Sequence, residues 1–237
     1  MYSIAEVVTP SRTGKDGRLK FIAALNMMQD CLEMWLSSEN YFRNYFLANN
    51  ISQLLVSRQV CVLRVPLFGE KLTITTSVFE CTGSYGYRNT IICDEDGSIC
   101  YVTWSTGAFI NHDTGRLAKI PPEITGALVI DPKFDMEYLD RKIVAPESGY
   151  IEYEPIEVKK YDIDYNLHMN NSQYVRIASE FLPEEFDVKR FRVEYRSPAK
   201  YKDKLYPKIL KVNDDRIFII LMNEKKRENT VMEFLNK

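Results

Sequence analysis

The sequence predicts an α+β fold in which one plan, a helix followed by antiparallel strands, occurs twice. Three observations support this prediction. Each half contains a helical apolar pattern, each pattern is followed by runs of β-branched and aromatic residues between turn signals, and a proline-rich segment lies between the halves. We therefore expect two modules joined by a connector.

The first half contains one long predicted helix, which begins near residue 19. Its apolar residues recur at spacings of three and four, the period of a buried helix face; they are Phe21, Leu25, Met28, Leu32 and Trp35. Strand-like runs follow over residues 57–65, 71–80, 85–95 and 98–110. Turn signals between these runs, such as Phe68-Gly69 and Gly83-Ser84, predict an antiparallel meander.

The second half repeats this order. We expect a strand over residues 149–161 and a helix from about Asn171 to Leu182. The strands expected after this helix cover residues 190–197, 203–212, 216–223 and 228–235. The repeated order indicates an internal duplication.

A short repeated sequence pattern supports the duplication. Residues 64–66 (Arg-Val-Pro) precede residues 70–72 (Glu-Lys-Leu) much as residues 196–198 (Arg-Ser-Pro) precede residues 203–205 (Asp-Lys-Leu), with one residue inserted.

The segment between the halves predicts a connector. It contains Pro121, Pro122, Gly126, Pro132 and Pro146 and shows no sustained hydrophobic period. The predicted domains are therefore residues 1–125 and 149–237, with a linker over residues 126–148.

Composition excludes several classes of function. Thirty-one Lys and Arg residues against 33 Asp and Glu residues give a net charge of −2, so a nucleic-acid partner is not expected. No run approaches the roughly 18 apolar residues that cross a bilayer, and the first residues lack a signal-peptide pattern. We expect a cytoplasmic protein without a membrane span.

No metal or cofactor site is expected from the side chains available. The five cysteines lie in apolar patterns without C-x-x-C spacing, so we interpret them as reduced core residues. The two histidines, His112 and His168, are far apart in sequence and have no metal-ligand spacing. His112 lies in a predicted surface turn.

The most informative motif is YDIDYNLHMNNSQY, residues 161–174. Asp162, Asp164 and Asn166 occupy every second position, and His168 follows. In an extended chain, Asp164, Asn166 and His168 would share one side. The corresponding stretch of the first half, residues 10–20, has no histidine or asparagine and only one acid, so the two copies have diverged in chemistry.

This constellation could activate water against an acyl carbon. Histidine is the usual general base near neutral pH, and a carboxylate can fix its tautomer. Asn170 or Asn171 can cap the following helix, whose N-terminal N–H groups suit an oxyanion. The alternative is structural: the acids and Asn166 form a turn, Asn171 is a plain cap, and His168 is a satisfied histidine.

The motif closely resembles the D-x-D-x-N-x-H-x-N-N-x-x-Y signature of acyl-ACP thioesterases, tandem hotdog enzymes that release fatty acids from acyl carrier protein (ACP). Three further stretches resemble the family: LKFIAALNMMQDCL, the segment from residue 85 to residue 124, and RFRVEYRSPAKYKDKL. The resemblance therefore covers nearly the whole chain.

The resemblance implies a hotdog fold in each half, a long helix wrapped by an antiparallel sheet. The C-terminal copy would be catalytic and the N-terminal copy would hold the acyl chain. It assigns catalysis to Asp164, Asn166 and His168. We expect His168 and Asp164 to activate and orient water or to polarise the thioester, and Asn166 to position the carbonyl or the water.

Two departures from the family pattern stand out. Pro198 and Ala199 occupy the places of a family Glu-Cys pair, and neither can move a proton. A thiol leaving group with a pKa of about 8.5 departs without strong acid help, so hydrolysis could persist. Gly107 stands where a bulky aromatic residue is expected, which would reshape the chain pocket.

The partner that the resemblance implies is ACP carrying a fatty acyl chain. Because ACP is acidic, its docking face should be basic. The basic residues near the motif are Lys159, Lys160, Arg176, Lys189, Arg190, Lys200, Lys202 and Lys204. The alternative is that most of them are solvated surface charges.

Several functions stay open at this stage. The first is hydrolysis of acyl-ACP to free fatty acid and holo-ACP, and acyl-CoA is an alternative substrate. A hotdog protein that binds acyl chains or ACP without turnover is the second, and a lyase acting on hydroxyacyl thioesters is the third. A homodimer is compatible with the sequence.

Overall fold

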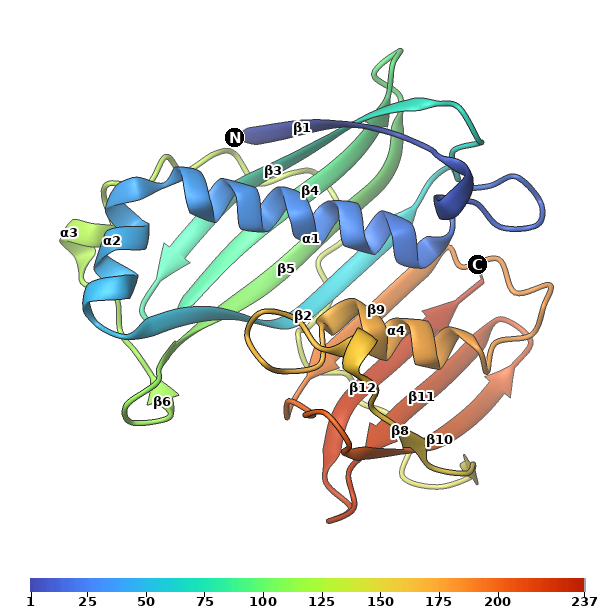
Figure 1. The fold of residues 1–237 in the computed structure, drawn as a ribbon. Helices are drawn as coiled ribbons and strands as arrows, with labels where there is room; N and C mark the ends of the chain where they lie inside the picture. The colour runs from blue at the N-terminus through green and yellow to red at the C-terminus, as the bar shows by residue number, and fades with distance from the viewer. Residues whose placement is uncertain (237) are drawn as a thin grey trace. The chain divides into compact units, whose positions relative to one another are not determined.

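The computed structural model describes residues 1–236, and the chain divides into two compact units. Unit 1 comprises residues 1–56 and 60–138, and unit 2 comprises residues 57–59 and the chain from residue 139 onward. Each unit packs a helix against an antiparallel sheet (Figure 1). The division falls after Tyr138, inside the segment that the sequence assigns to the linker.

Unit 1 contains the longer helix and the longer strands. Its elements are β1 (Tyr2–Val7), a 3-10 helix (Pro10–Arg12), α1 (Phe21–Ser38), α2 (Asn40–Ala48), β2 (Ile51–Val62), β3 (Lys71–Thr82), β4 (Tyr85–Asp94), β5 (Ile99–Asn111), β6 (Arg116–Leu117) and α3 (Pro122–Thr125). The sheet order is β1-β3-β4-β5-β2, with β6 paired to β5. The pairs β3·β4 and β4·β5 are antiparallel, as the meander predicts. The first strand of the predicted meander is placed differently, because β2 neighbours β5 and β3 pairs instead with β1.

The predicted helix of unit 1 is confirmed, and its face follows the sequence period. Leu25, Met28, Leu32 and Trp35 are buried on α1. Sequence reasoning missed α2, whose Asn, Tyr and Phe residues have modest helix propensity. Packing forms this helix: its buried Phe42 and Phe46 rings lie 5.9 Å and 5.4 Å from the Phe109 ring.

The edge strand β1 was also missed. It pairs with β3 from Tyr2↔Thr76 to Val7↔Lys71. Its side chains alternate between exposed and half-buried, so none of its six residues is part of the fully buried core. An edge strand of this kind leaves only a weak hydrophobic signal in the sequence.

Unit 2 has a shorter helix and a sheet in the order β9-β12-β11-β10-β7, with β8 paired to β10. Its elements are β7 (Ile151–Glu152), β8 (Ile156–Glu157), a 3-10 helix (Lys160–Asp162), α4 (Asn171–Ser179), β9 (Arg190–Tyr195), β10 (Lys204–Asn213), β11 (Arg216–Met222) and β12 (Glu228–Leu235). The four predicted strands after the helix are confirmed.

Two predictions in unit 2 were wrong in extent. The strand expected over residues 149–161 is two short strands, because Pro155 lies between them and has no N–H for a ladder. The helix expected to reach Leu182 ends at Ser179. Pro183 follows Leu182, and a residue before proline is disfavoured in helical geometry.

The connector has little regular structure, yet it is packed. In unit 1, the Phe134 N–H and the Tyr138 hydroxyl each donate to Asn89 Oδ1 at 3.0 Å. In unit 2, the buried Ile143 packs in a cluster with Phe218, Ile220 and Val231. The absence of a hydrophobic period therefore indicates irregular backbone here, and not exposure.

The loops that precede α1 and α4 have the same backbone. An isolated bridge joins Thr13 to Leu19 in unit 1, and the equivalent bridge joins Ile163 to Met169 in unit 2. The Gly14 N–H donates to the Arg18 carbonyl at 2.8 Å, and the Asp164 N–H donates to the His168 carbonyl at 3.0 Å. The two loops therefore superpose in register, residue for residue.

This register aligns chemically different side chains. Gly14, Asp16 and Arg18 occupy the positions of Asp164, Asn166 and His168. The residue between the last two also matches in backbone: Gly17 has a φ of +74° and Leu167 has a φ of +62°.

The register also corrects the alignment of the repeated pattern at residues 64–72 and 196–205, which precedes the following strand. The Leu19 N–H donates to the Pro66 carbonyl, and the equivalent Met169 N–H donates to the Ala199 carbonyl, both at 2.8 Å. Pro66 therefore corresponds to Ala199 and not to Pro198, and no inserted residue is needed.

Candidate active site

The polar motif before α4 folds as a compact turn. A 3-10 helix, Lys160–Asp162, leads into it. The Leu167 N–H donates to the Asp164 carbonyl at 3.0 Å, and the Asp164 N–H donates to the His168 carbonyl at 3.0 Å. The expected extended geometry, with Asp164, Asn166 and His168 on one side of a strand, is therefore wrong.

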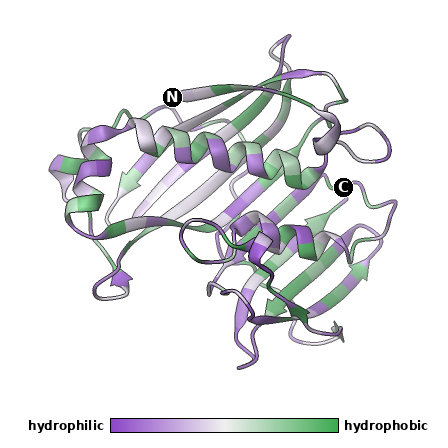
Figure 2. Cartoon of the chain, viewed as in Figure 1, coloured by the Kyte–Doolittle hydropathy of each residue, from purple (hydrophilic) through white to green (hydrophobic). Residues whose placement is uncertain are grey.

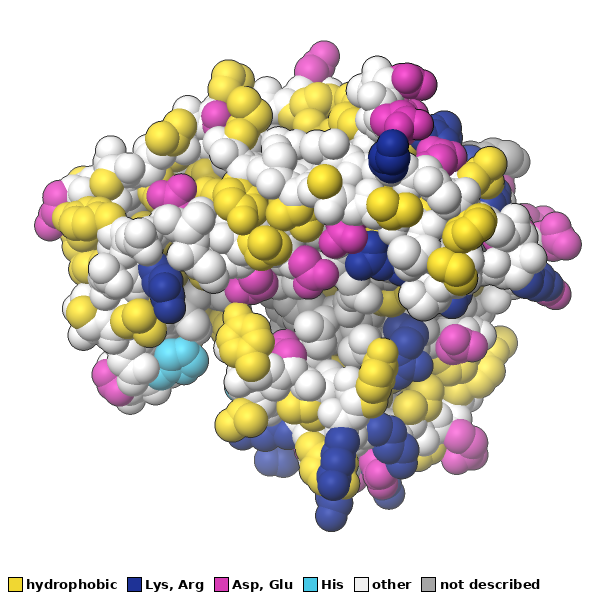
Figure 3. Space-filling view, turned by 45° about the horizontal axis from the view of Figure 1, so that its top comes forward, with side chains coloured by type: hydrophobic (Ala, Val, Ile, Leu, Met, Phe, Trp, Pro, Cys, Tyr) yellow, Lys and Arg dark blue, Asp and Glu magenta, His cyan; other side chains and the backbone are white. Residues whose placement is uncertain are grey.

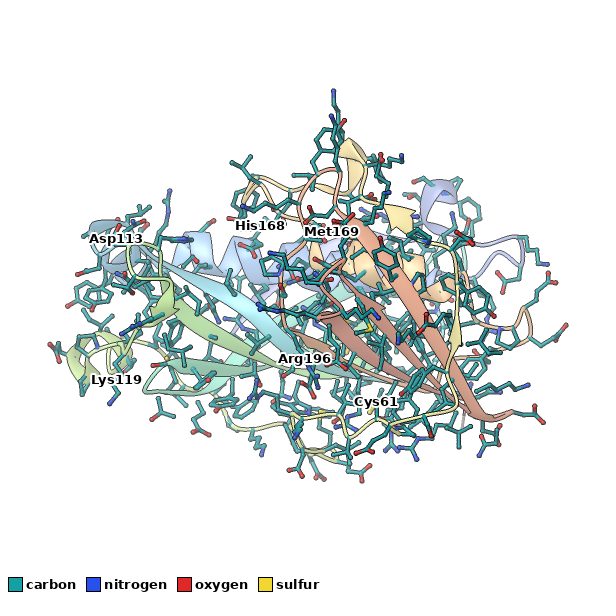
Figure 4. The ribbon with its side chains drawn as sticks, turned by 90° about the horizontal axis from the view of Figure 1, so that it is seen from below. Cys61, Asp113, Lys119, His168, Met169 and Arg196 are labelled. Carbon is teal, nitrogen blue, oxygen red and sulfur yellow. The ribbon has the colours of Figure 1, made fainter. Side chains whose placement is uncertain are left out.

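The Asp164 carboxylate holds this turn together. Its Oδ1 accepts the Asn166 N–H at 2.9 Å, a local bond that favours turns over strands. Asn166 is exposed, whereas Asp164 and His168 are half-buried. Figure 4 labels His168 and its neighbour Met169 on this loop. Asp164 is thus placed to fix the backbone that carries the other two candidate residues.

Asp162 fixes the start of the loop. Its carboxylate is 4% exposed and pairs with the Arg176 guanidinium of α4 at 2.9 Å. The same carboxylate accepts the Lys159 N–H at 2.8 Å, and the Asp162 carbonyl accepts the Asn170 N–H at 2.8 Å. Three interactions therefore tie this one residue to both ends of the motif.

Asn170, one of the two residues predicted to cap this helix, caps α4. Its Oδ1 accepts the Ser172 N–H at 2.9 Å, and its carbonyl accepts the Gln173 N–H at 2.9 Å. These two N–H groups are already used within the cap, so they do not form the oxyanion site considered from the sequence.

Ala199 is a structural contact of the loop. It is 1% exposed, its carbonyl accepts the Met169 N–H at 2.8 Å, and its N–H donates to the Tyr174 hydroxyl at 2.7 Å. Burial raises the pKa of Tyr174 well above its ordinary value. The Ala199 backbone thus supports the loop, although its side chain cannot move a proton.

The surface beside the loop combines exposed apolar and basic side chains, which sequence reasoning identified only in part. Tyr161, Tyr165 and Leu167 are 85%, 77% and 76% exposed. The ring of Tyr201 lies 5.9 Å from Lys160 Nζ and 5.5 Å from Lys202 Nζ. We call this set, together with the exposed Lys159, Lys200 and Lys204, the loop surface.

Other titratable groups do not form a second centre. No cluster of three His, Cys, Asp or Glu side chains that could hold a metal occurs among residues 1–236. Burial raises the pKa values of the Cys31 and Cys81 thiols to about 11, which makes them poor nucleophiles at neutral pH. His112 lies in an exposed turn.

Two family models match the chain. Residues 8–128 match the acyl-ACP thioesterase N-terminal domain, and residues 147–232 match the acyl-ACP thioesterase C-terminal domain. The second match contains the whole motif with Asp164, Asn166 and His168.

Curated relatives are similar over part of their length. A chloroplastic acyl-[acyl-carrier-protein] hydrolase of Cuphea viscosissima is 26% identical over 184 residues, which is 73% of this chain and 44% of that protein. A chloroplastic dodecanoyl-[acyl-carrier-protein] hydrolase of Cinnamomum camphora is 29% identical over 151 residues, 58% of this chain and 38% of that protein. The chain thus spans less than half the length of these relatives.

Solved structures confirm the predicted fold class of two tandem hotdog domains. An acyl-ACP thioesterase from Bacteroides thetaiotaomicron superposes with a TM-score of 0.88 at 20% identity, over 98% of this chain and 96% of that one. The 12:0-ACP thioesterase from Umbellularia californica gives a TM-score of 0.85 at 19% identity, over 99% and 96% of the two chains.

Proposed function

Because this chain belongs to the acyl-ACP thioesterase family, we propose that it hydrolyses fatty acyl-ACP to free fatty acid and holo-ACP. The observation that carries this proposal is the match of both family domains, which includes the polar loop before α4. No helix among residues 1–236 is long and apolar enough to cross a membrane. A cytoplasmic location and a homodimer stay predictions from the sequence.

His168 is proposed as the general base. It takes a proton from water while the water oxygen bonds to the thioester carbonyl carbon. The C–S bond then breaks, the carbonyl re-forms, and the departing carrier sulfur takes the proton back from His168. Because a thiol is a good leaving group, the reaction needs no strong acid where Pro198 and Ala199 replace the family Glu-Cys pair.

Asp164 and Asn166 are proposed to act through the geometry of the turn. The Asp164 carboxylate holds the Asn166 N–H at 2.9 Å and leaves the Asn166 side chain exposed. The Asn166 amide can then position the substrate carbonyl or the attacking water. The Asp164 carboxylate is also proposed to orient the attacking water.

The two units are proposed to divide the work. Residues 149–237 would supply the catalytic loop, residues 1–125 would hold the acyl chain, and residues 126–148 would link them. The asymmetry of the two loops supports this division, because the unit 1 loop has Gly14, Asp16 and Arg18 in place of the candidate residues.

The loop surface is the proposed ACP contact. Lys and Arg side chains gather together with hydrophobic ones at the lower edge of Figure 3. An acidic carrier is attracted by such lysines, and exposed tyrosines supply apolar contact area. Because surface charges act through long-range attraction, this contact should weaken as ionic strength rises.

Release of free thiol tests the proposal. The native protein is mixed with acyl-ACPs of several chain lengths and with the same chains on CoA, at low and at high salt. We expect thiol release from acyl-ACP, faster than from acyl-CoA, with the difference reduced by salt. Tight binding of acyl-ACP without thiol release would instead support a protein that binds acyl-ACP without turnover. The absence of the Glu-Cys pair is the observation that favours this alternative.

A further inference from the structure

The α1-facing side of the unit 1 sheet is polar across its middle. Arg88 of β4 identifies this side, because its guanidinium lies 4.1 Å from the centre of the Trp35 ring of α1. Thr90, two residues along, shares the face. The partners of these two residues on β5 are Ser105 and Thr103. All four are almost fully buried, and we call them the polar stripe.

The matching side of the unit 2 sheet is apolar. Tyr195 of β9 packs its ring near α4, and Phe191 and Val193 share its face. Their partners on β12 are Phe234 and Met232, and these four are 0–1% exposed. Figure 2 shows the contrast: hydrophobic green dominates the strands of unit 2, while pale and purple segments cross the sheet of unit 1. These paired positions are therefore polar in unit 1 and apolar in unit 2.

Two glycines extend the polar stripe. Gly86 and Gly107 are paired across β4 and β5, on the face of Arg88 and Ser105. The Gln53 side chain of β2 fills the space above them: a Cβ on Gly107 would lie 2.8 Å from Gln53 Cγ and Cδ. A Cβ on Gly86 would lie 3.3 Å from Phe109 Cζ and 3.5 Å from Gln53 Nε2, so the Phe109 ring shares the space above that glycine. The expected aromatic side chain at position 107 is thus replaced by an amide from a neighbouring strand.

Two oxygens in this region lack a hydrogen-bond partner. Gln53 Oε1 and Thr103 Oγ1 are buried and accept no bond within residues 1–236. By contrast, the hydroxyls of Thr76 and Thr90 on the same face bond to each other at 3.0 Å. A buried acceptor without a donor is unfavourable, and most such groups in proteins are satisfied. Both oxygens can therefore accept a hydrogen bond from a molecule that enters unit 1.

We propose that unit 1 accepts an acyl chain bearing a hydroxyl group remote from the thioester, and that this hydroxyl donates to Gln53 Oε1 or Thr103 Oγ1. The inference rests on the proposed function, in which unit 1 holds the acyl chain. A plain methylene chain has no donor and leaves both oxygens unsatisfied. A protonated amine would also donate, but the guanidinium of Arg88 on the same face repels a cation.

Binding of free acids to the full-length native protein tests this inference without turnover. The probes are dodecanoic acid and its isomers with a single hydroxyl at different carbons, titrated by calorimetry. At least one hydroxy isomer is expected to bind about tenfold more tightly than dodecanoic acid. Equal affinities for all probes, or no binding of any of them, would overturn the inference.

Two threonines of β5 provide a matched comparison. Thr103 and Thr106 are both buried, and both hydroxyl oxygens lack a partner within residues 1–236. They differ in direction, because an odd spacing along a strand puts Thr106 on the opposite face. Thr103→Val or Gln53→Leu should remove the preference for the hydroxy acid, whereas Thr106→Val should keep it. Retention of the preference in both Thr103→Val and Gln53→Leu, or its loss in Thr106→Val, would contradict the assignment.

Thiol release separates this inference from the proposed function. A protein that prefers the hydroxy acid but releases no thiol from acyl-ACP would support the inference and reject hydrolysis. A protein that releases thiol but shows no preference among the free acids would do the reverse. Circular dichroism and thermal melting check that each variant is folded. Because Gln53 and Thr103 lie on different strands, the test can still be made with one variant if the other does not fold.

Discussion

The carboxylate of Asp162 and the guanidinium of Arg176 form an ion pair, 2.9 Å long, that joins the candidate active-site loop to α4. The Asp162 side chain is 4% exposed and the Arg176 side chain 40% exposed. The pair is therefore half-buried, and removal of one partner should cost more than at a pair that is fully in water.

Asp162→Ala should lower the free energy of unfolding by about 1–3 kcal/mol, because the Arg176 guanidinium and the Lys159 N–H lose a buried acceptor. Urea unfolding measures the change. Asp187→Ala is the control, since Asp187 pairs with Lys189 at the surface, and it should cost less than about 1 kcal/mol. Equal losses in the two variants would show that Asp162 does not hold the loop.

His168→Ala should reduce kcat/KM for acyl-ACP at least about tenfold, because the variant lacks the general base. The other histidine of the chain supplies the control. His112 lies in an exposed turn, and His112→Ala should keep the native rate and the native stability. An unchanged rate in His168→Ala would place the chemistry elsewhere.

Substitutions at Asp164 separate its charge from its role in the turn. Asp164→Ala should lower kcat/KM at least about tenfold and destabilise the protein by about 1 kcal/mol, because the Asn166 N–H loses its acceptor. Asp164→Asn keeps an oxygen for that bond, so its stability should stay native while the rate still falls. If both variants unfold at the same urea concentration, the turn does not depend on this side chain.

Leu167→Gly should leave stability unchanged or raise it by up to about 1 kcal/mol. Leu167 has a φ of +62°, a strained region for a leucine, and its side chain is 76% exposed, so little burial is lost. Leu167→Val is the comparison and should destabilise, since a β-branched residue suffers more at positive φ. Thermal unfolding of both variants gives the answer; a large loss for glycine would contradict the strain argument.

Alkaline pH should destabilise unit 1 through Cys31. Burial raises the pKa of this thiol from 9.0 to about 11, so the folded state favours the neutral form. Its contribution is complete below about pH 9 and is lost as pH rises through about 11, on the order of 1–2 kcal/mol. Urea unfolding across this range should show a shallower decline for Cys31→Val than for the native protein. Parallel curves would exclude this thiol as the cause.

Long periodic elements could be predicted from the sequence because their burial pattern is regular. The face of α1 follows from apolar spacing, and the strands β3, β4, β5 and β9 to β12 follow from runs of β-branched and aromatic residues between turn signals. Elements that form through tertiary contacts could not. The helix α2 depends on packing of Phe42 and Phe46 against Phe109, and β1 depends on its pairing with β3.

The candidate residues could be selected from the sequence, but their geometry could not. Alternation of Asp164, Asn166 and His168 implies one shared side only if the backbone is extended. A leucine at positive φ, which closes the turn, has no sequence signature. The one available signal was Gly17 at the matching position of the first copy, because glycine is the usual residue for that conformation.

Because the two loops share one backbone, the candidate catalytic residues of unit 2 differ from their unit 1 counterparts only in their side chains. Either copy can gain or lose the polar set by point substitutions while its main chain stays in place. Gly14, Asp16 and Arg18 therefore mark where the candidate catalytic residues could be installed in unit 1 by three replacements, without redesign of the scaffold.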